Sequence, residues 1–150
     1  MIKLLVVHGP NLNLLGQRQK DIYGDKSLIF INEKIKEEAL KKDVLLDIFQ
    51  SNSEGKMIDF IQEKKVESSG MIINPGGYSH TSVALYDALL AYEKPVIEVH
   101  LSNPLKRETF REPLLTAKAC CGVILGFGWR SYIVGLHEVI ELMRKARKNG

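Results

Sequence analysis

The chain contains very little cysteine. Its 150 residues include two cysteines, Cys120 and Cys121, and these are adjacent in the sequence. Adjacent side chains on a strand point to opposite faces, so a disulfide bond between these two residues is geometrically poor. Because there is no other cysteine, the sequence provides neither a disulfide framework nor a cysteine-rich zinc site. We therefore expect a reduced, cytoplasmic protein.

An excess of one charge and long apolar stretches are also missing. The chain has 21 Lys and Arg against 18 Asp and Glu, a formal net charge of +3, which is too small to indicate nucleic-acid binding without a concentrated patch. The densest basic run, 144–148, ends the last helical pattern, where cations complement the helix dipole. No apolar stretch approaches the roughly 20 residues of a membrane span, and the start of the chain lacks a signal-peptide cleavage region. We expect no nucleic-acid partner and no membrane association.

Several common ligand-binding motifs are absent as well. The chain has neither the G-x-G-x-x-G pattern nor a P-loop, so nucleotide cofactors have little support. Ser79 lies in a segment that lacks the second glycine of a nucleophile elbow, which argues against an acyl-transfer serine. The four histidines are scattered, without the H-x-x-x-H spacing of metal ligands. We expect no metal ion and no organic cofactor.

Apolar runs typical of buried strands alternate with helical patterns along the whole chain. The predicted strands are 2–8, 44–49, 70–74, 95–100 and 121–127. The predicted helices are 28–42, 54–65, 81–91 and 131–148, with Ser27 and Ser53 as caps and Asn103-Pro104 as a further helix start. This alternation predicts an α/β fold, a parallel sheet with helices on both faces. Since the sequence shows no repeat or linker, we predict one domain over 1–150.

Three of the predicted strands end in clusters of polar residues. The segments 8–13, 74–82 and 98–103 follow apolar runs and are rich in Asn, His and Ser. An open α/β sheet binds its ligands outside the carboxyl ends of its strands. The three clusters therefore predict one convergent pocket.

One connection, 11–26, is unusually long for a strand-to-helix loop, which commonly takes about 2–6 residues. It shows no periodicity and carries Arg18 and Tyr23 among polar residues. A long loop at the carboxyl end of a sheet is typical of an active-site lid. A disordered surface loop is the alternative.

Two pairs of residues could support acid–base chemistry or anion binding. Glu98 and His100 lie two apart on a strand and so share a face, where a carboxylate would stabilise and orient a protonated imidazole. A purely structural histidine at a strand end is the alternative. Arg107 and Arg111 are four apart, which would place both on one helical face to hold an anion. A solvent-exposed charged helix is again the alternative.

Taken together, the motifs resemble those of the type II 3-dehydroquinate dehydratases, or type II dehydroquinases, over nearly the whole chain. The matching segments are 8–18 (HGPNLNLLGQR), 23–24 (YG), 50–54 (QSNSE), 74–85 (NPGGYSHTSVAL), 98–103 (EVHLSN) and 107–111 (RETFR). The chain departs from the family pattern at 112–115, where EPLL replaces a polar stretch that contains a serine. That departure leaves the local packing of the arginine segment open, but it removes no matched site residue.

The resemblance implies a flavodoxin-like, open five-stranded parallel sheet and a lyase reaction. The family removes water from 3-dehydroquinate to give 3-dehydroshikimate through an enolate, without metal or organic cofactor. This step belongs to the shikimate pathway toward chorismate and the aromatic amino acids. The family's enzymes are typically dodecamers built as four trimers, so the resemblance also implies a homo-oligomer.

The resemblance assigns a role to each matched residue. Tyr23 would be the general base, and Arg18 would stabilise its ionised form. His100, oriented by Glu98, would protonate the leaving hydroxyl, while Asn11 would stabilise the enolate oxygen through an ordered water. The implied substrate-binding residues are Asn74, Ser102 and the backbone of Leu101 for the carboxylate, His80 and Arg111 for the ring hydroxyls, Arg107 in support, and Asp87 reaching a neighbouring subunit's pocket.

Other classes of protein share this architecture. A flavodoxin-like nucleotide-binding protein needs a phosphate-cradling loop after the first strand, but Gly9-Pro10-Asn11 is short and Pro10 lacks an N–H donor. A phospho-accepting receiver domain needs acidic residues at the first and third strand ends, where this chain has His8 and Asn74. A binding module without catalytic activity stays open from the residues alone.

Overall fold

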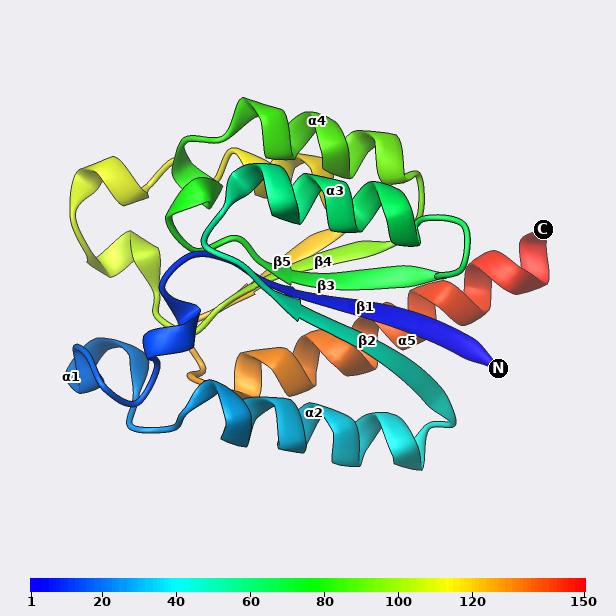
Figure 1. Cartoon of the computed structure of the whole chain (residues 1–150), viewed down its shortest axis with the longest axis horizontal. Coiled ribbons are helices and arrows are strands. Elements are labelled where there is room, and N and C mark those ends of the chain that lie inside the picture. Colours follow the sequence, from blue (N-terminus) through cyan, green and yellow to red (C-terminus); the bar gives the residue numbers. More distant parts are fainter.

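Five parallel strands form one open sheet at the centre of the structure (Figure 1). The computed structural model describes residues 1–150, and the strands follow the order β2-β1-β3-β4-β5. Their bounds are β1 (Ile2–His8), β2 (Val44–Gln50), β3 (Gly70–Asn74), β4 (Val96–His100) and β5 (Gly122–Leu125). The parallel sheet and its flavodoxin-like strand order confirm the predicted fold class.

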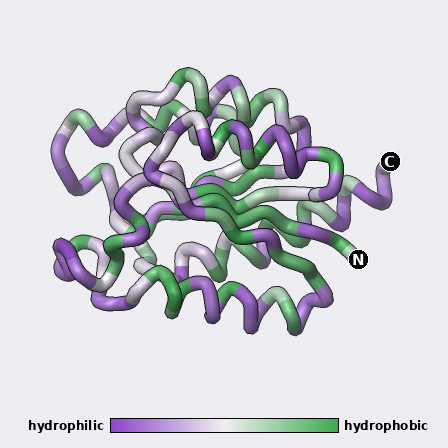
Figure 2. The backbone as a smooth tube through the Cα atoms, in the orientation of Figure 1, coloured by the Kyte–Doolittle hydropathy of each residue, from purple (hydrophilic) through white to green (hydrophobic).

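Helices cover both faces of this sheet. In Figure 1, α2 (Leu28–Lys41) and α5 (Arg130–Asn149) lie below the sheet, and α3 (Glu54–Lys64) and α4 (Val83–Tyr92) lie above it. Consecutive residues of β1 divide between the two layers: Leu4 belongs to the α2/α5 core and Leu5 to the α3/α4 core. Figure 2 shows the resulting apolar centre and the polar outer faces of the helices. No helix has both the length and the apolar character needed to cross a membrane.

Serine caps fix where three of these helices begin. Ser27 Oγ accepts from the backbone N–H of Phe30 at 3.1 Å and Ser53 Oγ from that of Lys56 at 3.2 Å, as the sequence predicts. Ser82 Oγ accepts from the N–H of Leu85 at 2.9 Å, so α4 starts later than the predicted 81. Each cap satisfies a donor that would otherwise lack a partner at the helix N-terminus.

The segment after β4 differs from the prediction. Asn103 does cap a turn with Pro104 at its start, but the turn is the short 3₁₀ helix η3 (Pro104–Lys106). Arg107 is extended, with φ −107° and ψ −157°, and a separate 3₁₀ helix, η4 (Thr109–Arg111), follows. The prediction that Arg107 and Arg111 share one helical face is therefore wrong, because the chain breaks between them.

The connection 11–26 is also more ordered than its sequence indicates. It contains the 3₁₀ helix η1 (Leu12–Leu14) and the four-residue helix α1 (Lys20–Tyr23), both too short to produce a periodic pattern. Leu12 and Leu15 are buried in the α2/α5 core and anchor the start of the connection. These contacts rule out a wholly disordered surface loop, while the proposed lid movement stays a prediction.

Candidate active site

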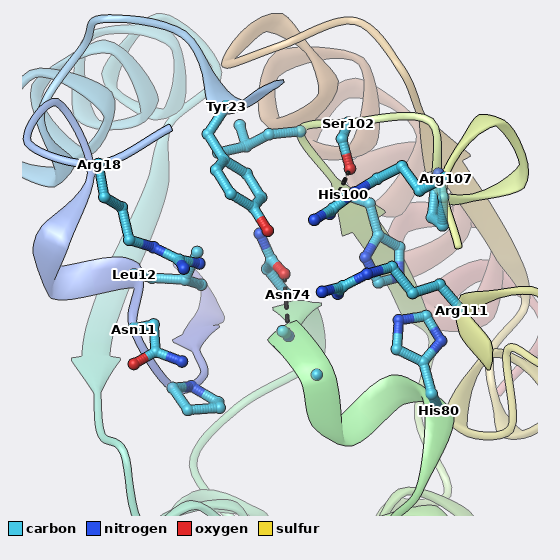
Figure 3. Close-up of a pocket in the computed structure, with 15 residues that line it drawn as sticks. Asn11, Leu12, Arg18, Tyr23, Asn74, His80, His100, Ser102, Arg107 and Arg111 are labelled. Atoms are coloured by element: carbon cyan, nitrogen blue, oxygen red, sulfur yellow. Dashed lines mark hydrogen bonds between the residues drawn. The ribbon is translucent and has the colours of Figure 1, made fainter. Parts of the chain in front are cut away.

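A cavity of about 200 Å³ lies outside the carboxyl ends of the strands, where the sequence predicts a convergent pocket. The predicted site residues that line it are Asn11, Arg18, Tyr23, Asn74, His80, His100, Leu101, Ser102, Arg107 and Arg111. Figure 3 labels all of these except Leu101, and their side chains come from the 11–26 connection, from segment 74–80 and from segment 100–111. Two predicted residues, Glu98 and Asp87, do not line the cavity.

Close contact between two loops forms the floor of this pocket. β1 and β3 are neighbours with His8 opposite Asn74, so the loops that follow them meet. A Cβ on Gly9 would lie 2.5 Å from the carbonyl oxygen of Pro75, which only glycine avoids. Gly76 has φ +59°, and a Cβ there would lie 3.0 Å from the oxygen of Pro10.

The matching segment 50–54 supports the turn that carries Asn11. Asn11 adopts a left-handed backbone conformation with φ 68°. Its N–H donates to Asn52 Oδ1 at 3.0 Å, and Gln50 Nε2 donates to the oxygen of Gly9 at 3.2 Å. These bonds hold Asn11 at the cavity in a conformation that asparagine tolerates better than most residues.

Tyr23 lies between two guanidinium groups. The guanidinium carbon of Arg18 is 4.7 Å from the centre of the Tyr23 ring, and that of Arg107 is 5.1 Å from it. Figure 3 shows the Tyr23 hydroxyl directed into the cavity. The Nε atom of Arg18 is buried and has no hydrogen-bond partner. Two permanent cations therefore lie beside one phenol at the cavity.

His100 lies in the cavity wall with a buried carboxylate behind it. His100 Nε2 donates to Glu98 Oε2 at 2.8 Å, and Glu98 is completely buried. Its Nδ1 is therefore the ring nitrogen left to act on a ligand. This confirms that the two side chains share a face, and it explains why Glu98 is absent from the cavity surface.

Two hydroxyl groups complete the surroundings of Glu98, and the sequence did not predict either role. Ser79 Oγ donates to Glu98 Oε2 at 2.8 Å, and Thr116 Oγ1 donates to Oε1. Ser79 belongs to η2 (Gly76–His80) and Thr116 to η5 (Thr116–Ala119). Hydrogen bonds of this kind stabilise the ionised carboxylate and hold it in place. Ser79 lies within a matching motif, whereas nothing in the sequence around Thr116 indicated its contact.

His80 and Arg111 lie on the same side of the cavity as His100 (Figure 3). His80 Nδ1 donates to the carbonyl oxygen of Pro113 at 2.8 Å, which leaves Nε2 free. Burial lowers the pKa of His80 below its ordinary value, although the bond to Pro113 opposes this shift. Arg111 Nε donates to Glu108 Oε2 at 2.7 Å. The 112–115 departure thus still packs against the site, because it supplies the acceptor for His80.

Comparison with known proteins decides the family. The model of the family "Dehydroquinase class II" matches residues 2–140. The chain belongs to this family. It is 48% identical over 145 residues to a 3-dehydroquinate dehydratase of Halothermothrix orenii, covering 97% of this chain and 98% of that one. It is 47% identical over 147 residues to that of Clostridium botulinum strain Hall, covering 98% and 100%.

Solved structures of class II dehydroquinases agree with this placement. The crystal structure of the type II dehydroquinase from Butyrivibrio crossotus superposes with a TM-score of 0.91 at 41% identity, covering 93% of this chain and 97% of that chain. The family resemblance derived from the motifs is therefore confirmed, and so is the family's α/β architecture.

Asp87 is the one predicted site residue that neither lines the cavity nor is hydrogen-bonded to a residue that does. It is exposed on α4 and does not line the pocket of its own chain. Its contribution to a neighbouring subunit stays a prediction.

Three arginines give this cavity a cationic lining. No group of three or more His, Cys, Asp or Glu side chains is placed to hold a metal ion. The arrangement of one phenol, one carboxylate-backed imidazole and several amide and guanidinium donors suits proton transfer on a small anion.

Proposed function

We propose that this chain is a 3-dehydroquinate dehydratase that converts 3-dehydroquinate to 3-dehydroshikimate through an enolate, with no metal or organic cofactor. The observation that carries the proposal is the presence of two proton-transfer groups in one cavity. Tyr23 stands beside the guanidinium groups of Arg18 and Arg107, and His100 is held by the buried Glu98. The names of the curated relatives support the same reaction.

In the first step, the Tyr23 oxygen removes a proton from the carbon beside the substrate ketone. The electron pair of the broken C–H bond moves onto the ketone oxygen and forms an enolate. Asn11 stabilises this oxygen through an ordered water. Arg18, which lies against the Tyr23 ring, offsets negative charge during this step.

In the second step, the enolate re-forms the ketone, and the carbon–oxygen bond to the tertiary hydroxyl breaks. Protonated His100 gives the Nδ1 proton to the departing hydroxyl, so that water leaves. Glu98 stabilises the imidazolium before this transfer. A proton then passes from Tyr23 through solvent to His100, and the starting protonation states return.

Neutral donors hold the substrate carboxylate in this proposal. The Ser102 hydroxyl accepts from Arg107 Nη1 at 3.4 Å, so its own proton stays available for the carboxylate. The Leu101 backbone and the Asn74 amide supply the other donors. His80 and Arg111 bind the ring hydroxyls.

We extend the proposal to the oligomeric state, the cellular location and the metabolic pathway of the protein. The family resemblance supports a homododecamer of four trimers, with Asp87 of one subunit reaching the next subunit's pocket. It also supports a cytoplasmic enzyme of the shikimate pathway that supplies chorismate and aromatic amino acids.

A direct assay tests the proposed function. Purified protein is mixed with 3-dehydroquinate, and the ultraviolet absorbance of the enone product is followed with and without EDTA. We expect equal turnover with and without EDTA. We also expect that borohydride in the presence of substrate does not inactivate the protein, because no lysine lines the cavity to form a Schiff base. Absence of product would refute the proposed activity. Loss of activity in EDTA that a divalent ion restores would refute the metal-free mechanism.

A further inference from the structure

A buried chain of hydrogen bonds runs from Asn74 into the core. Asn74 Nδ2 donates to the Tyr132 hydroxyl at 3.1 Å, and that hydroxyl lies 2.8 Å from His8 Nδ1. His8 Nε2 lies 2.8 Å from Asn32 Oδ1. The four residues come from β3, α5, β1 and α2, so the chain runs from the pocket floor along the α2/α5 face of the sheet to a covering helix. His8 and Tyr132 are completely buried, and Asn74 is 3% exposed.

The amide of Asn74 sets the order of protons along this chain. Its Oδ1 accepts from the N–H of Gly76 at 3.1 Å, so Nδ2 faces Tyr132 and can only donate. The Tyr132 oxygen accepts that bond, and its own proton goes to His8 Nδ1, the other partner of the hydroxyl. A buried hydroxyl proton without an acceptor would be costly. His8 is therefore neutral, with its proton on Nε2 and donated to Asn32.

Burial keeps the His8 ring and the Tyr132 hydroxyl neutral near pH 7. It lowers the pKa of His8 to about 4, against the smaller opposing effect of the bond to Asn32. It also raises the pKa of Tyr132 well above its ordinary value. The direction of the hydrogen bonds is thus fixed at neutral pH.

This order leaves the Asn74 amide one free hydrogen. Its oxygen is engaged by Gly76 and one Nδ2 hydrogen by Tyr132, while the residue lines the cavity. If the amide turned over, its oxygen would face an anionic ligand and repel it. Without the Tyr132 hydroxyl, only the Gly76 N–H would oppose that rotation.

We propose that Tyr132 and His8 are positioning residues, which hold the Asn74 amide with its free N–H toward the carboxylate of the substrate. This inference rests on the proposed function, from which it takes the contact between Asn74 and the substrate carboxylate. Neither Tyr132 nor His8 touches the substrate, and both act through Asn74.

The test is Tyr132→Phe, which keeps the ring and removes the hydroxyl. We expect KM for 3-dehydroquinate to rise by about tenfold, the equivalent of one hydrogen bond, with kcat within about twofold of wild type. KM should change and kcat should not, because the substrate carboxylate keeps its charge throughout the reaction. Its contacts therefore bind the substrate and the transition state equally well. The matched control is Tyr92→Phe, which removes a buried hydroxyl bonded to Ser68 Oγ in the α3/α4 core. Equal KM values in the two variants would overturn the positioning role.

A double-variant cycle checks that Tyr132 acts through Asn74. Once Asn74→Ala has removed the amide, adding Tyr132→Phe should change KM by less than about twofold. A second, independent tenfold rise would contradict the inference. Circular dichroism of each variant confirms that the fold is retained.

Nitrogen NMR of the His8 ring tests the proton order even if a variant fails to fold. In wild-type protein at neutral pH, Nδ1 should resonate as an unprotonated acceptor and Nε2 as a protonated nitrogen. The opposite tautomer would overturn the inference. An inactive wild type would instead overturn the proposed function, whereas an active wild type with unchanged KM in Tyr132→Phe overturns the positioning role alone.

Discussion

The guanidinium carbon of Arg18 lies 4.7 Å from the centre of the Tyr23 ring, and both side chains line one cavity. They belong to the same long connection, with Tyr23 at the end of α1 and Arg18 just before that helix. A guanidinium keeps its charge at every working pH, so it stabilises the Tyr23 oxygen whenever that oxygen is anionic. The connection therefore delivers a base and its supporting cation together.

Removing this cation should impair catalysis strongly. We expect Arg18→Ala to lower kcat for 3-dehydroquinate by on the order of 10²–10³, the scale of one electrostatic contribution to a transition state. Arg18→Lys is the matched control and should lose less, because it keeps the charge but not the planar group. Steady-state kinetics measures both. An Arg18→Ala enzyme within about threefold of wild type would show that Arg18 does not support the base.

The buried carboxylate behind His100 gives a second prediction. Glu98 accepts from Ser79, His100 and Thr116, whereas a glutamine would offer one oxygen and no charge. We expect Glu98→Gln to lower kcat by roughly 10²-fold, the scale of general acid catalysis, with a smaller effect on KM. Glu112→Gln, which neutralises an exposed carboxylate nearby, is the control and should leave kcat unchanged. Similar kcat values for both variants would exclude a role for Glu98.

The buried His8 makes stability depend on pH. Burial lowers its pKa from 6.5 to about 4, so between these values the unfolded state binds more protons than the folded state. The free energy of unfolding therefore rises with pH across this window. His8 contributes about 3 kcal/mol to this rise, which is complete above pH 6.5. Urea unfolding at pH 4.5, 5.5 and 7, at fixed protein concentration, measures this rise in the free energy of unfolding. His8→Asn should show a smaller rise, and an identical rise would contradict the assignment.

Asp87 gives a prediction about assembly. It is exposed and does not line its own chain's cavity, so the proposed role is a contact with the pocket of a neighbouring subunit. We expect Asp87→Ala and Tyr23→Phe each to be impaired alone, and hybrids of the two to regain activity. In a hybrid, an Asp87→Ala subunit keeps Tyr23 and receives Asp87 from its neighbour. Subunits are mixed, dissociated and reassembled before assay. Verified hybrids without recovery would mean that Asp87 does not act across subunits.

Most of the architecture could be predicted from periodicity and caps. The strands β1 and β3 were predicted with the observed bounds, because a strand buried on both faces is a continuous apolar run. The edge strand β5 ends at Leu125 instead of the predicted 127, since Gly126 leaves the sheet with φ +93°. The break between Arg107 and Arg111 could not be predicted, because four-residue spacing fits a helix and two 3₁₀ turns equally well.

The candidate site, like the fold, has features that the sequence could predict and features that it could not. Residues at strand ends, such as Asn74 and His100, could be placed in one pocket, because parallel strands deliver their carboxyl ends to one edge. Contacts between distant segments could not be predicted. Thr116 reaches Glu98 from a segment without any pattern, and Tyr132 reaches Asn74 from the final helix. Both depend on how the layers pack, which a local pattern does not encode.

Tyr23→Phe tests the central claim most directly, because it deletes only the oxygen that is proposed to take the proton. Turnover of 3-dehydroquinate is followed by enone absorbance, and binding of the product 3-dehydroshikimate by calorimetry. We expect kcat to fall by at least about 10²-fold while product binding stays within about threefold of wild type. A Tyr23→Phe enzyme that keeps more than about a tenth of the wild-type rate would contradict the claim, and another group would have to be the base.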